Sequence, residues 1–239
     1  MIVKPILVLA GGFGSRLKVA VSDVPKPLAP VCGKPFLIHL IEHLVSQGAD
    51  SFVLLLHYEA DLIRAIVDEV LNRHDMVGVK ITSIVEERPL GTGGAIINAI
   101  KTLNINESFL VVNADTWLGD GLKKISLSAP NSIVAVKVND CSRYGGLVVK
   151  GAMVETFLEK KLSYNNGLIN AGLYHLSADI FSEYVGNDSF SLEAEVFPKV
   201  ASNGILSVVE VDADFIDIGI PEDYYRFCNW IDSGKKNDL

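Results

Sequence analysis

Apolar residues in the first half of the chain follow two alternating patterns. Short runs of strand character, rich in apolar residues, occur at 6–10, 51–56, 79–87 and 108–115. Between them, apolar residues at helical spacing predict helices over Phe36–Gln47 and Glu59–His74, and a short helix after the GTGG run at 91–94. Alternating strands and helices predict a mainly parallel sheet with helices on both faces, whose ligands bind at the carboxyl ends of the strands.

The second half is less regular. Runs of strand character lie at 132–138, 145–149, 153–159, 170–176, 205–211 and 214–219. A short helix is expected over 191–201, with Ser191 as its cap, and another over 221–231, opening with Pro221. Because the sequence contains no repeat, low-complexity segment or linker, we expect one mixed α/β domain over residues 1–239.

Composition and charge exclude several classes of protein. Of the 239 residues 49% are apolar, yet no apolar run reaches the roughly 18 residues of a membrane span. The N-terminus lacks a signal-peptide cleavage site. A net charge of −8 without a basic stripe argues against a nucleic-acid surface. Cys32, Cys141 and Cys228 fit no disulfide or metal framework, so we expect buried, inert thiols in a reducing compartment, the cytoplasm.

A glycine-rich loop follows the first predicted strand, in the segment LAGGFGSRLKVAVSDVPKPLAPVCGKP at 9–35. Glycines there let backbone N–H groups approach phosphate oxygens, although a plain tight turn would look the same. Arg16 adds a fork of donors, and prolines on both sides of Lys26 restrict its backbone. The dinucleotide fingerprint fails because position 17 is leucine, which argues against an oxidoreductase, and CGKP is not a Walker A loop.

Two aspartates end apolar strands far apart in the chain. Asp115 follows FLVV and Asp217 lies in FIDIG. Mg²⁺ prefers oxygen ligands and takes one or two protein carboxylates together with substrate phosphates. The alternative is that both are ordinary surface acids at strand ends.

These segments resemble the signature of the sugar-1-phosphate nucleotidyltransferases, the nucleoside-diphospho-sugar pyrophosphorylases. The resemblance continues in family order through ERPLGTGGA, VVNAD, FLEK, INAGLY, SLEAEVFP and DIGIPEDY, and ends at about residue 224. It implies a Rossmann-like, GT-A-like fold. We expect no appended C-terminal β-helix domain, since the chain ends soon after the last motif.

The resemblance also implies roles for individual residues. The nucleotide would be bound by Leu9, Ala10, Gly11, Gly12, Gly14, Arg16, Lys26, Glu87, Gly91, Thr92 and Gly93. The sugar phosphate would be bound by Asn113, Glu159, Lys160, Asn170, Gly172 and Glu193. Mg²⁺ would be held by Asp115 and Asp217, which together with Arg16 and Lys26 form the catalytic set.

The implied reaction joins a nucleoside triphosphate to a sugar 1-phosphate and releases pyrophosphate. The motifs are most similar to guanylyltransferases, which favours GTP with D-glycero-D-manno-heptose 1-phosphate. Mannose 1-phosphate, or UTP, dTTP or CTP in place of GTP, remain alternatives, as does a regulatory module of the same fold without catalysis. A homodimer and a monomer are both open.

Two further features of the sequence each allow two structural explanations. HLIEH at 39–43 matches an inverted zinc-protease pattern, but an apolar helix explains the same spacing, with His39 and His43 beside the stripe. Trp117 can either line the pocket or pack in the core.

Overall fold

The computed structural model describes residues 4–14, 16–21, 24–71, 76–141, 144–158, 165–186 and 189–235. The chain divides into two compact units that are built from separate stretches of sequence. Unit 1 consists of residues 1–88, 113–119 and 214–239, and unit 2 of residues 89–112 and 120–213. Because the chain passes repeatedly from one unit to the other, residues far apart in the sequence can belong to the same unit.

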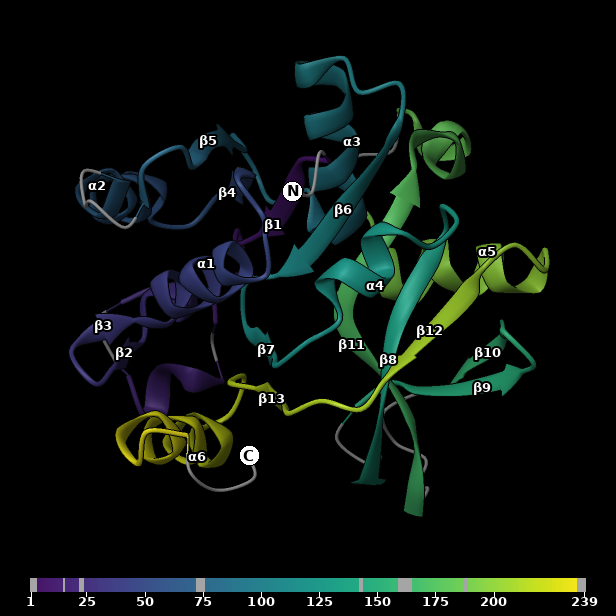
Figure 1. The fold of residues 1–239 in the computed structure, drawn as a ribbon. Helices are drawn as coiled ribbons and strands as arrows, with labels where there is room; N and C mark the ends of the chain where they lie inside the picture. The colour runs from purple at the N-terminus through teal and green to yellow at the C-terminus, as the bar shows by residue number, and fades with distance from the viewer. Residues whose placement is uncertain are drawn as a thin grey trace. The chain divides into compact units, whose positions relative to one another are not determined.

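Unit 1 contains a parallel three-stranded segment, in the order β5-β4-β1, with helices connecting its strands (Figure 1). Its strands are β1 (Ile6–Leu9), β2 (Pro30–Val31), β3 (Lys34–Pro35), β4 (Ser51–Leu56), β5 (Lys80–Val85), β7 (Thr116–Leu118) and β13 (Phe215–Asp217). Its helices are α1 (Phe36–Ser46), α2 (Ala60–Leu71), α6 (Pro221–Asp232) and the 3₁₀ turns η1 (Leu17–Val19) and η2 (Lys26–Leu28). The predicted helices over 36–47 and 221–231 are confirmed.

The apolar pattern explains these elements. In β4 every residue after Ser51 is buried, as expected for a strand covered on both faces. One face of α1 is buried, and the helix ends just before Gly48, whose φ of 99° suits only a residue without a side chain. The N–H of Gly48 donates to the carbonyl of Val45 and closes the last turn.

A short antiparallel ribbon brings the two predicted metal-binding aspartates together in unit 1. β7 pairs with β13 in a register that places Thr116 opposite Asp217. The next backbone bond continues this register, since the N–H of Ile218 donates to the carbonyl of Asp115 at 3.0 Å. The two carboxylates therefore lie at the same end of one ribbon.

Unit 2 has a mixed sheet in the order β6-β11-β8-β12-β10-β9. The strands are β6 (Ser108–Asn113), β8 (Ser132–Asp140), β9 (Gly146–Lys150), β10 (Met153–Leu158), β11 (Asn165–Ser177) and β12 (Ser207–Val211). The helices are α3 (Gly91–Leu103), α4 (Leu122–Ser126), α5 (Phe197–Ser202), the 3₁₀ segment η4 (Ala178–Tyr184) and the π-helical turn η5 (Leu192–Val196). The expected α/β fold with a mixed sheet is confirmed: β8 and β12 are parallel, whereas β11 is antiparallel to both β6 and β8.

The expectation that all three cysteines are buried is wrong in part. Cys141 is buried, but Cys228 is only half-buried and Cys32 is exposed. Cys32 lies in the tight turn between β2 and β3 and has a φ of 48°. All three thiols are free.

None of the helices in the described ranges combines the length and the apolar character that crossing a membrane requires.

Candidate active site

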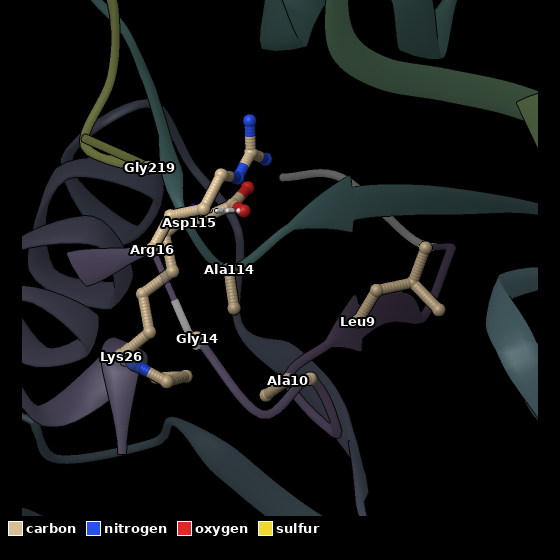
Figure 2. Close-up of a pocket in the computed structure, with 10 residues that line it drawn as sticks. Leu9, Ala10, Gly14, Arg16, Lys26, Ala114, Asp115 and Gly219 are labelled. Carbon is tan, nitrogen blue, oxygen red and sulfur yellow. Dashed lines mark hydrogen bonds and ion pairs between the residues drawn. The ribbon is translucent and has the colours of Figure 1, made fainter. Parts of the chain in front are cut away.

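A cavity of about 200 Å³ lies in unit 1, where the glycine-rich loop meets the residues that follow β6 (Figure 2). Its lining is Leu9, Ala10, Gly12, Gly14, Arg16, Lys26, Pro27, Ala114, Asp115 and Gly219. Most of the residues that the sequence assigned to the opening loop therefore surround one space. Pro27, which the sequence marked only as a neighbour of Lys26, also lines it, and Ala114 and Gly219 do so without having been singled out from the sequence.

The glycines of the loop differ in how much room their surroundings leave for a side chain. A Cβ on Gly14, whose φ is 59°, would lie 2.5 Å from the Cβ of Lys26, so only glycine lets the loop pass this side chain. A Cβ on Gly11 would lie 3.3 Å from the Cβ of His57, a close but less severe approach. A Cβ on Gly12, in contrast, would meet no heavy atom of the described residues within 4 Å, so its backbone faces open space. Gly12 is thus the glycine best placed for a ligand to approach.

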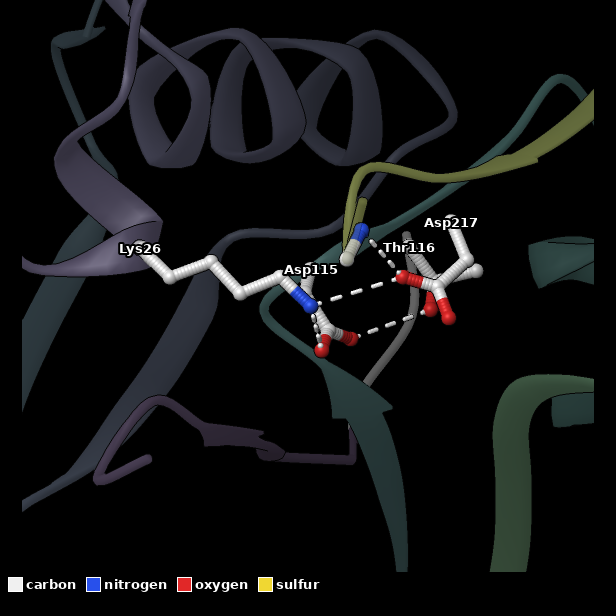
Figure 3. Close-up of polar contacts among 5 residues, drawn as sticks. Lys26, Asp115, Thr116 and Asp217 are labelled. Atoms are coloured by element: carbon white, nitrogen blue, oxygen red, sulfur yellow. Dashed lines mark hydrogen bonds and ion pairs between the residues drawn. The ribbon is translucent and has the colours of Figure 1, made fainter. Parts of the chain in front are cut away.

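Lys26 lies between the two aspartates of the ribbon (Figure 3). Its Nζ donates to Asp115 Oδ2 at 2.6 Å and contacts Asp217 Oδ1 at 3.4 Å. The Lys26 side chain is only 11% exposed, whereas those of Asp115 and Asp217 are 37% and 28% exposed. Each carboxylate therefore keeps part of its surface open beyond the ammonium group.

Charge and hydrogen bonding keep Asp115 ionised. Desolvation alone would raise the pKa of its carboxyl group, but the charge of Lys26 and the hydrogen bonds donated by Lys26 and Thr116 outweigh it. The pKa of Asp115 is consequently lower than its ordinary value. An ionised carboxylate at neutral pH is the form that binds a metal ion.

The donor set around Lys26 fits a hard divalent cation. Asp115 and Asp217 both direct a carboxylate oxygen at one cationic atom, and Mg²⁺ needs one or two such ligands when phosphates supply the rest. Within the described ranges no cluster of three or more His, Cys, Asp or Glu side chains could hold a metal by itself. A metal bound here would thus complete its coordination with oxygens of substrate or water.

Gly219 is a site residue that sequence reasoning missed. Its N–H donates to Asp217 Oδ1 at 2.7 Å and holds that carboxylate in place. A Cβ on Gly219 would lie 2.7 Å from the same oxygen and 2.9 Å from Lys26 Nζ. The DIG sequence in which it stands is the available signal, but a glycine after a strand is also typical of an ordinary turn.

A second group of predicted residues lies together in unit 2. Thr92, expected at the nucleotide, donates through its hydroxyl to Glu193 Oε2 at 2.9 Å, and Glu193 was expected at the sugar. Gly91 and Gly93 flank this threonine and pack on Phe190, leaving no room for a side chain. The structure therefore joins motifs that the sequence assigned to different substrates.

Asn170 and Gly172 form a bulge within β11. The pairing of β11 with β8 shifts between Asn170 and Tyr174, and Gly172 there has a φ of 72°. The Asn170 side chain is fixed at both ends, since its amide donates to the Tyr174 hydroxyl and its oxygen accepts from the Gly172 N–H, both at 2.9 Å. Glu159 and Lys160, the predicted sugar-phosphate contact, lie outside the described residues.

Asn113 and Glu87, two predicted ligand contacts, differ in exposure: an oxygen of the Asn113 side chain is buried, whereas Glu87 is exposed. The Oδ1 atom of Asn113 is buried without a hydrogen-bond partner among the described residues, at the end of β6 and two residues before Asp115. Glu87 is exposed, whereas its neighbour Glu86 is 8% exposed and its carbonyl lies 3.1 Å from His57 Nδ1. Of these two acids, Glu87 is the one accessible to a ligand.

The two histidines of HLIEH serve the fold, as their apolar helix indicated. His39 Nε2 lies 3.0 Å from the carbonyl of Val31, and His43 Nε2 lies 2.9 Å from that of Leu118. Trp117 belongs to the core: it is 2% exposed and stacks on His43 with ring centroids 4.2 Å apart. Through the contacts of His43 with Leu118 and Trp117, α1 supports the ribbon that carries both aspartates.

Two curated relatives resemble this chain over more than nine-tenths of its length. The D-glycero-alpha-D-manno-heptose 1-phosphate guanylyltransferase of Campylobacter jejuni is 37% identical over 92% of this chain and 97% of its own length. Mannose-1-phosphate guanyltransferase 2 of Candida glabrata is 33% identical over 91% of this chain, which spans only 62% of that protein.

Solved structures and a family profile cover nearly the whole chain. The crystal structure of HddC from Yersinia pseudotuberculosis is 40% identical, covers 95% of this chain and 99% of its own, and superposes with a TM-score of 0.82. The same protein has been solved in complex with GMP-PN, with a TM-score of 0.81. The profile of the family described as nucleotidyl transferase matches residues 5–239, and the chain therefore belongs to the nucleotidyl transferase family.

Proposed function

We propose that this protein transfers the guanylyl group of GTP to D-glycero-D-manno-heptose 1-phosphate and releases pyrophosphate. The observation that carries the proposal is the cavity of unit 1, in which a glycine loop, Arg16 and Lys26 face the ribbon end with Asp115. Cationic side chains and open backbone beside paired carboxylates suit a triphosphate bound with a divalent cation.

The reaction needs little covalent chemistry from the protein. A phosphate oxygen of the sugar 1-phosphate attacks the α-phosphorus of GTP and forms a new P–O bond. The bond between the α-phosphorus and the bridging oxygen breaks, and pyrophosphate leaves with that electron pair. Since the nucleophile is already an anion, no general base is required, and catalysis consists of positioning and electrostatic stabilisation.

Each cationic side chain has its own task in this scheme. Arg16, exposed at the mouth of the loop, would meet the charge that develops on the leaving pyrophosphate. Lys26, whose ammonium group lies between two carboxylates, would also attract the negative charge of the triphosphate. Lys160 is proposed from the resemblance to hold the sugar phosphate.

Asp115 and Asp217 would hold Mg²⁺, the cation that we expect in the cytoplasm together with GTP. When bound, the metal supplies Lewis-acid polarisation of the phosphate oxygens. The chain contributes two carboxylates in fixed positions, because Thr116 donates to Asp115 and the Gly219 N–H donates to Asp217.

The proposed choice of substrates rests on the relatives and on two acidic side chains. The Campylobacter jejuni relative is named for D-glycero-alpha-D-manno-heptose 1-phosphate and for guanylyl transfer, and the Yersinia structure was solved with GMP-PN. Guanine presents N1–H and an exocyclic amine as donors, and the exposed Glu87 is a candidate acceptor for them. The side chains of Glu193 and Asn170 are candidates for hydrogen bonds with the sugar hydroxyls.

Mannose 1-phosphate is the second candidate sugar. It is favoured by the 33% identity to the guanyltransferase of Candida glabrata, although the present chain spans only 62% of that protein. The two sugars share the manno configuration, so both candidates predict the same preference over a gluco epimer.

Release of pyrophosphate from GTP, ATP, UTP, dTTP and CTP, each combined with a panel of sugar 1-phosphates, tests the proposal. We expect the highest kcat/KM for GTP with the heptose 1-phosphate. An acceptor left unpaired by adenine disfavours ATP by about 1–3 kcal/mol for each such group. A preference for UTP or dTTP would contradict the guanine assignment, and a preference for glucose 1-phosphate the manno assignment, while either result would leave nucleotidyl transfer intact.

A further inference from the structure

Two segments of unit 2, residues 90–93 and 190–193, are held together by backbone hydrogen bonds. The N–H of Gly93 donates to the carbonyl of Phe190 at 3.0 Å, and the N–H of Phe190 donates to the carbonyl of Leu90 at 3.1 Å. Gly91 and Gly93 make this pairing possible: Cβ atoms there would lie 2.4 Å from the Phe190 carbonyl oxygen and 2.2 Å from the Phe190 ring, respectively. The glycines of the GTGG motif are thus explained by close packing within the protein.

The hydroxyl of Thr92, between these glycines, is oriented by the opposite segment. It accepts a hydrogen bond from the Leu192 N–H at 2.8 Å and donates one to Glu193 Oε2 at 2.9 Å. Because the backbone N–H occupies one lone pair, the hydroxyl proton is directed at the carboxylate. Thr92 therefore caps the π-helical turn η5 from outside and binds the first acid in that turn.

A second hydroxyl supports the same carboxylate oxygen. Ser191 Oγ accepts from the Ala194 N–H at 3.1 Å and lies 3.2 Å from Glu193 Oε2, to which it donates. Oε2 thus receives two hydroxyl donors, while the structure gives Oε1 no partner among the described residues. Glu193 is half-buried, and π-helical turns occur frequently at functional sites. The arrangement fixes one oxygen of an acid and leaves the other available as an acceptor.

We propose that Thr92 is a positioning residue that holds Glu193, and that Glu193 Oε1 accepts a hydrogen bond from a hydroxyl of the sugar 1-phosphate. This inference rests on the proposed function for the identity of the ligand. It changes the role that the sequence suggested for Thr92, whose hydroxyl serves the sugar through Glu193 and makes no bond to the nucleotide.

Three single variants test the inference by their kinetics. Thr92→Val removes the hydroxyl with little change of shape, Thr92→Ser keeps it, and Thr102→Val removes an exposed hydroxyl from the same helix α3. We expect Thr92→Val to raise the KM for the sugar 1-phosphate about 10- to 100-fold, the range for a lost hydrogen bond to a charged group, with the KM for GTP unchanged. Thr92→Ser and Thr102→Val should behave like the wild type.

A double variant shows whether Thr92 acts through Glu193. Adding Thr92→Val to Glu193→Ala should cause no further rise in KM, because the partner has already gone. An independent additional effect, or a rise in the KM for GTP instead of the sugar, would overturn the positioning role and make Thr92 a nucleotide ligand. Comparable kinetics of Thr92→Val and Thr92→Ser would overturn it as well.

The proposed function and this inference fail in different ways. The kinetic comparison uses whichever triphosphate and sugar 1-phosphate the wild type prefers, so a substrate other than the heptose contradicts only the proposed function. If the wild type releases no pyrophosphate from any pair, calorimetric titration with the sugar 1-phosphates still compares Thr92→Val with Thr92→Ser. Equal binding by those two variants would overturn the positioning role.

Discussion

At the scale of single residues, Lys26 has an electrostatic task before any substrate arrives. Its ammonium group lies 2.6 Å from Asp115 and 3.4 Å from Asp217. Its positive charge offsets the repulsion between the two negative carboxylates. Lys26→Met should therefore lower the thermal midpoint in metal-free buffer. A loss between the ~1 kcal/mol of an exposed ion pair and the ~3 kcal/mol of a buried one is expected, because both carboxylates are partly exposed.

Added Mg²⁺ separates this effect from a general loss of packing. The cation should raise the midpoint of Lys26→Met more than that of the wild type, since it replaces the missing positive charge between the carboxylates. Lys150→Met is the control, because Lys150 and Glu155 form an ion pair with side chains 83% and 49% exposed. Equal Mg²⁺ responses in wild type and Lys26→Met would contradict a cation-binding position between the two carboxylates, where the Lys26 ammonium group lies.

Arg16 provides a second prediction at this scale. Charge grows on the departing pyrophosphate only as the transition state forms, so a donor aimed at it affects turnover more than binding. Arg16→Ala should lower kcat about 10²- to 10³-fold with a smaller change in the KM for the triphosphate. Steady-state kinetics at saturating sugar 1-phosphate measures both values.

Arg64→Ala is the matched control, because Arg64 lies on α2 and pairs with Asp61 on the surface. A change confined to KM in Arg16→Ala would make Arg16 an anchor for the ground state. The residue would then contribute to affinity and not to the rate of the chemical step.

At the scale of elements, the turn between β13 and α6 determines how Lys26 and Asp217 approach each other. Alanine at Gly219 would bring a methyl group within 3 Å of the Asp217 oxygen and of Lys26 Nζ. Both atoms are the ends of flexible side chains, so the fold can yield while the site is displaced. Gly219→Ala should thus reduce kcat/KM about 10- to 100-fold and leave the thermal midpoint nearly unchanged.

Gly119→Ala is the comparison for this turn, since Gly119 ends the same ribbon and a Cβ there would meet Asp214 only at 3.4 Å, an ordinary contact. Its activity and stability should both stay close to those of the wild type. If Gly219→Ala unfolded the protein, or retained full activity, the glycine would be a requirement of the backbone and not of the ion pair.

Elements with regular periodicity could be predicted from the sequence. The stripe over 36–47 predicted the right helix, because one buried face of α1 alone decides its position. The segment 191–201 was predicted as one helix, but it is a π-helical turn followed by α5. Apolar spacing does not separate the two kinds of turn, and Pro198 favours a new helix start at Phe197.

The site could be predicted as a set of residues but not as a set of contacts. Motifs placed Lys26, Asp115 and Asp217 in one site, yet a lysine shared by two carboxylates depends on the register of β7 and β13. Nor could sequence reveal the bond from Thr92 to Glu193, because it needs the backbone pairing of two segments in unit 2. Register and pairing are tertiary properties that local pattern leaves open.

At the scale of the whole molecule, the order of the chain connects the two units. The polypeptide passes from one unit to the other after residues 88, 112, 119 and 213, so neither unit is a continuous stretch. Unit 1 is complete only when residues 113–119 and 214–239 have joined the first 88. We therefore expect the units to fold together as the single domain that the sequence predicts.

Unfolding with urea tests this expectation, because the two tryptophans report on one unit only. Trp117 and Trp230, the only tryptophans of the sequence, both belong to unit 1 and have ring centroids 5.9 Å apart in its aromatic core. Far-ultraviolet circular dichroism reports on the helices and strands of both units. Fluorescence and dichroism should give the same midpoint and slope, as coincident transitions indicate a two-state process.

GTP with Mg²⁺ should then shift both midpoints by the same amount, because a ligand of the native state stabilises everything that unfolds with it. A fluorescence transition that precedes the dichroism transition, or moves alone when GTP and Mg²⁺ are added, would show that unit 1 unfolds by itself.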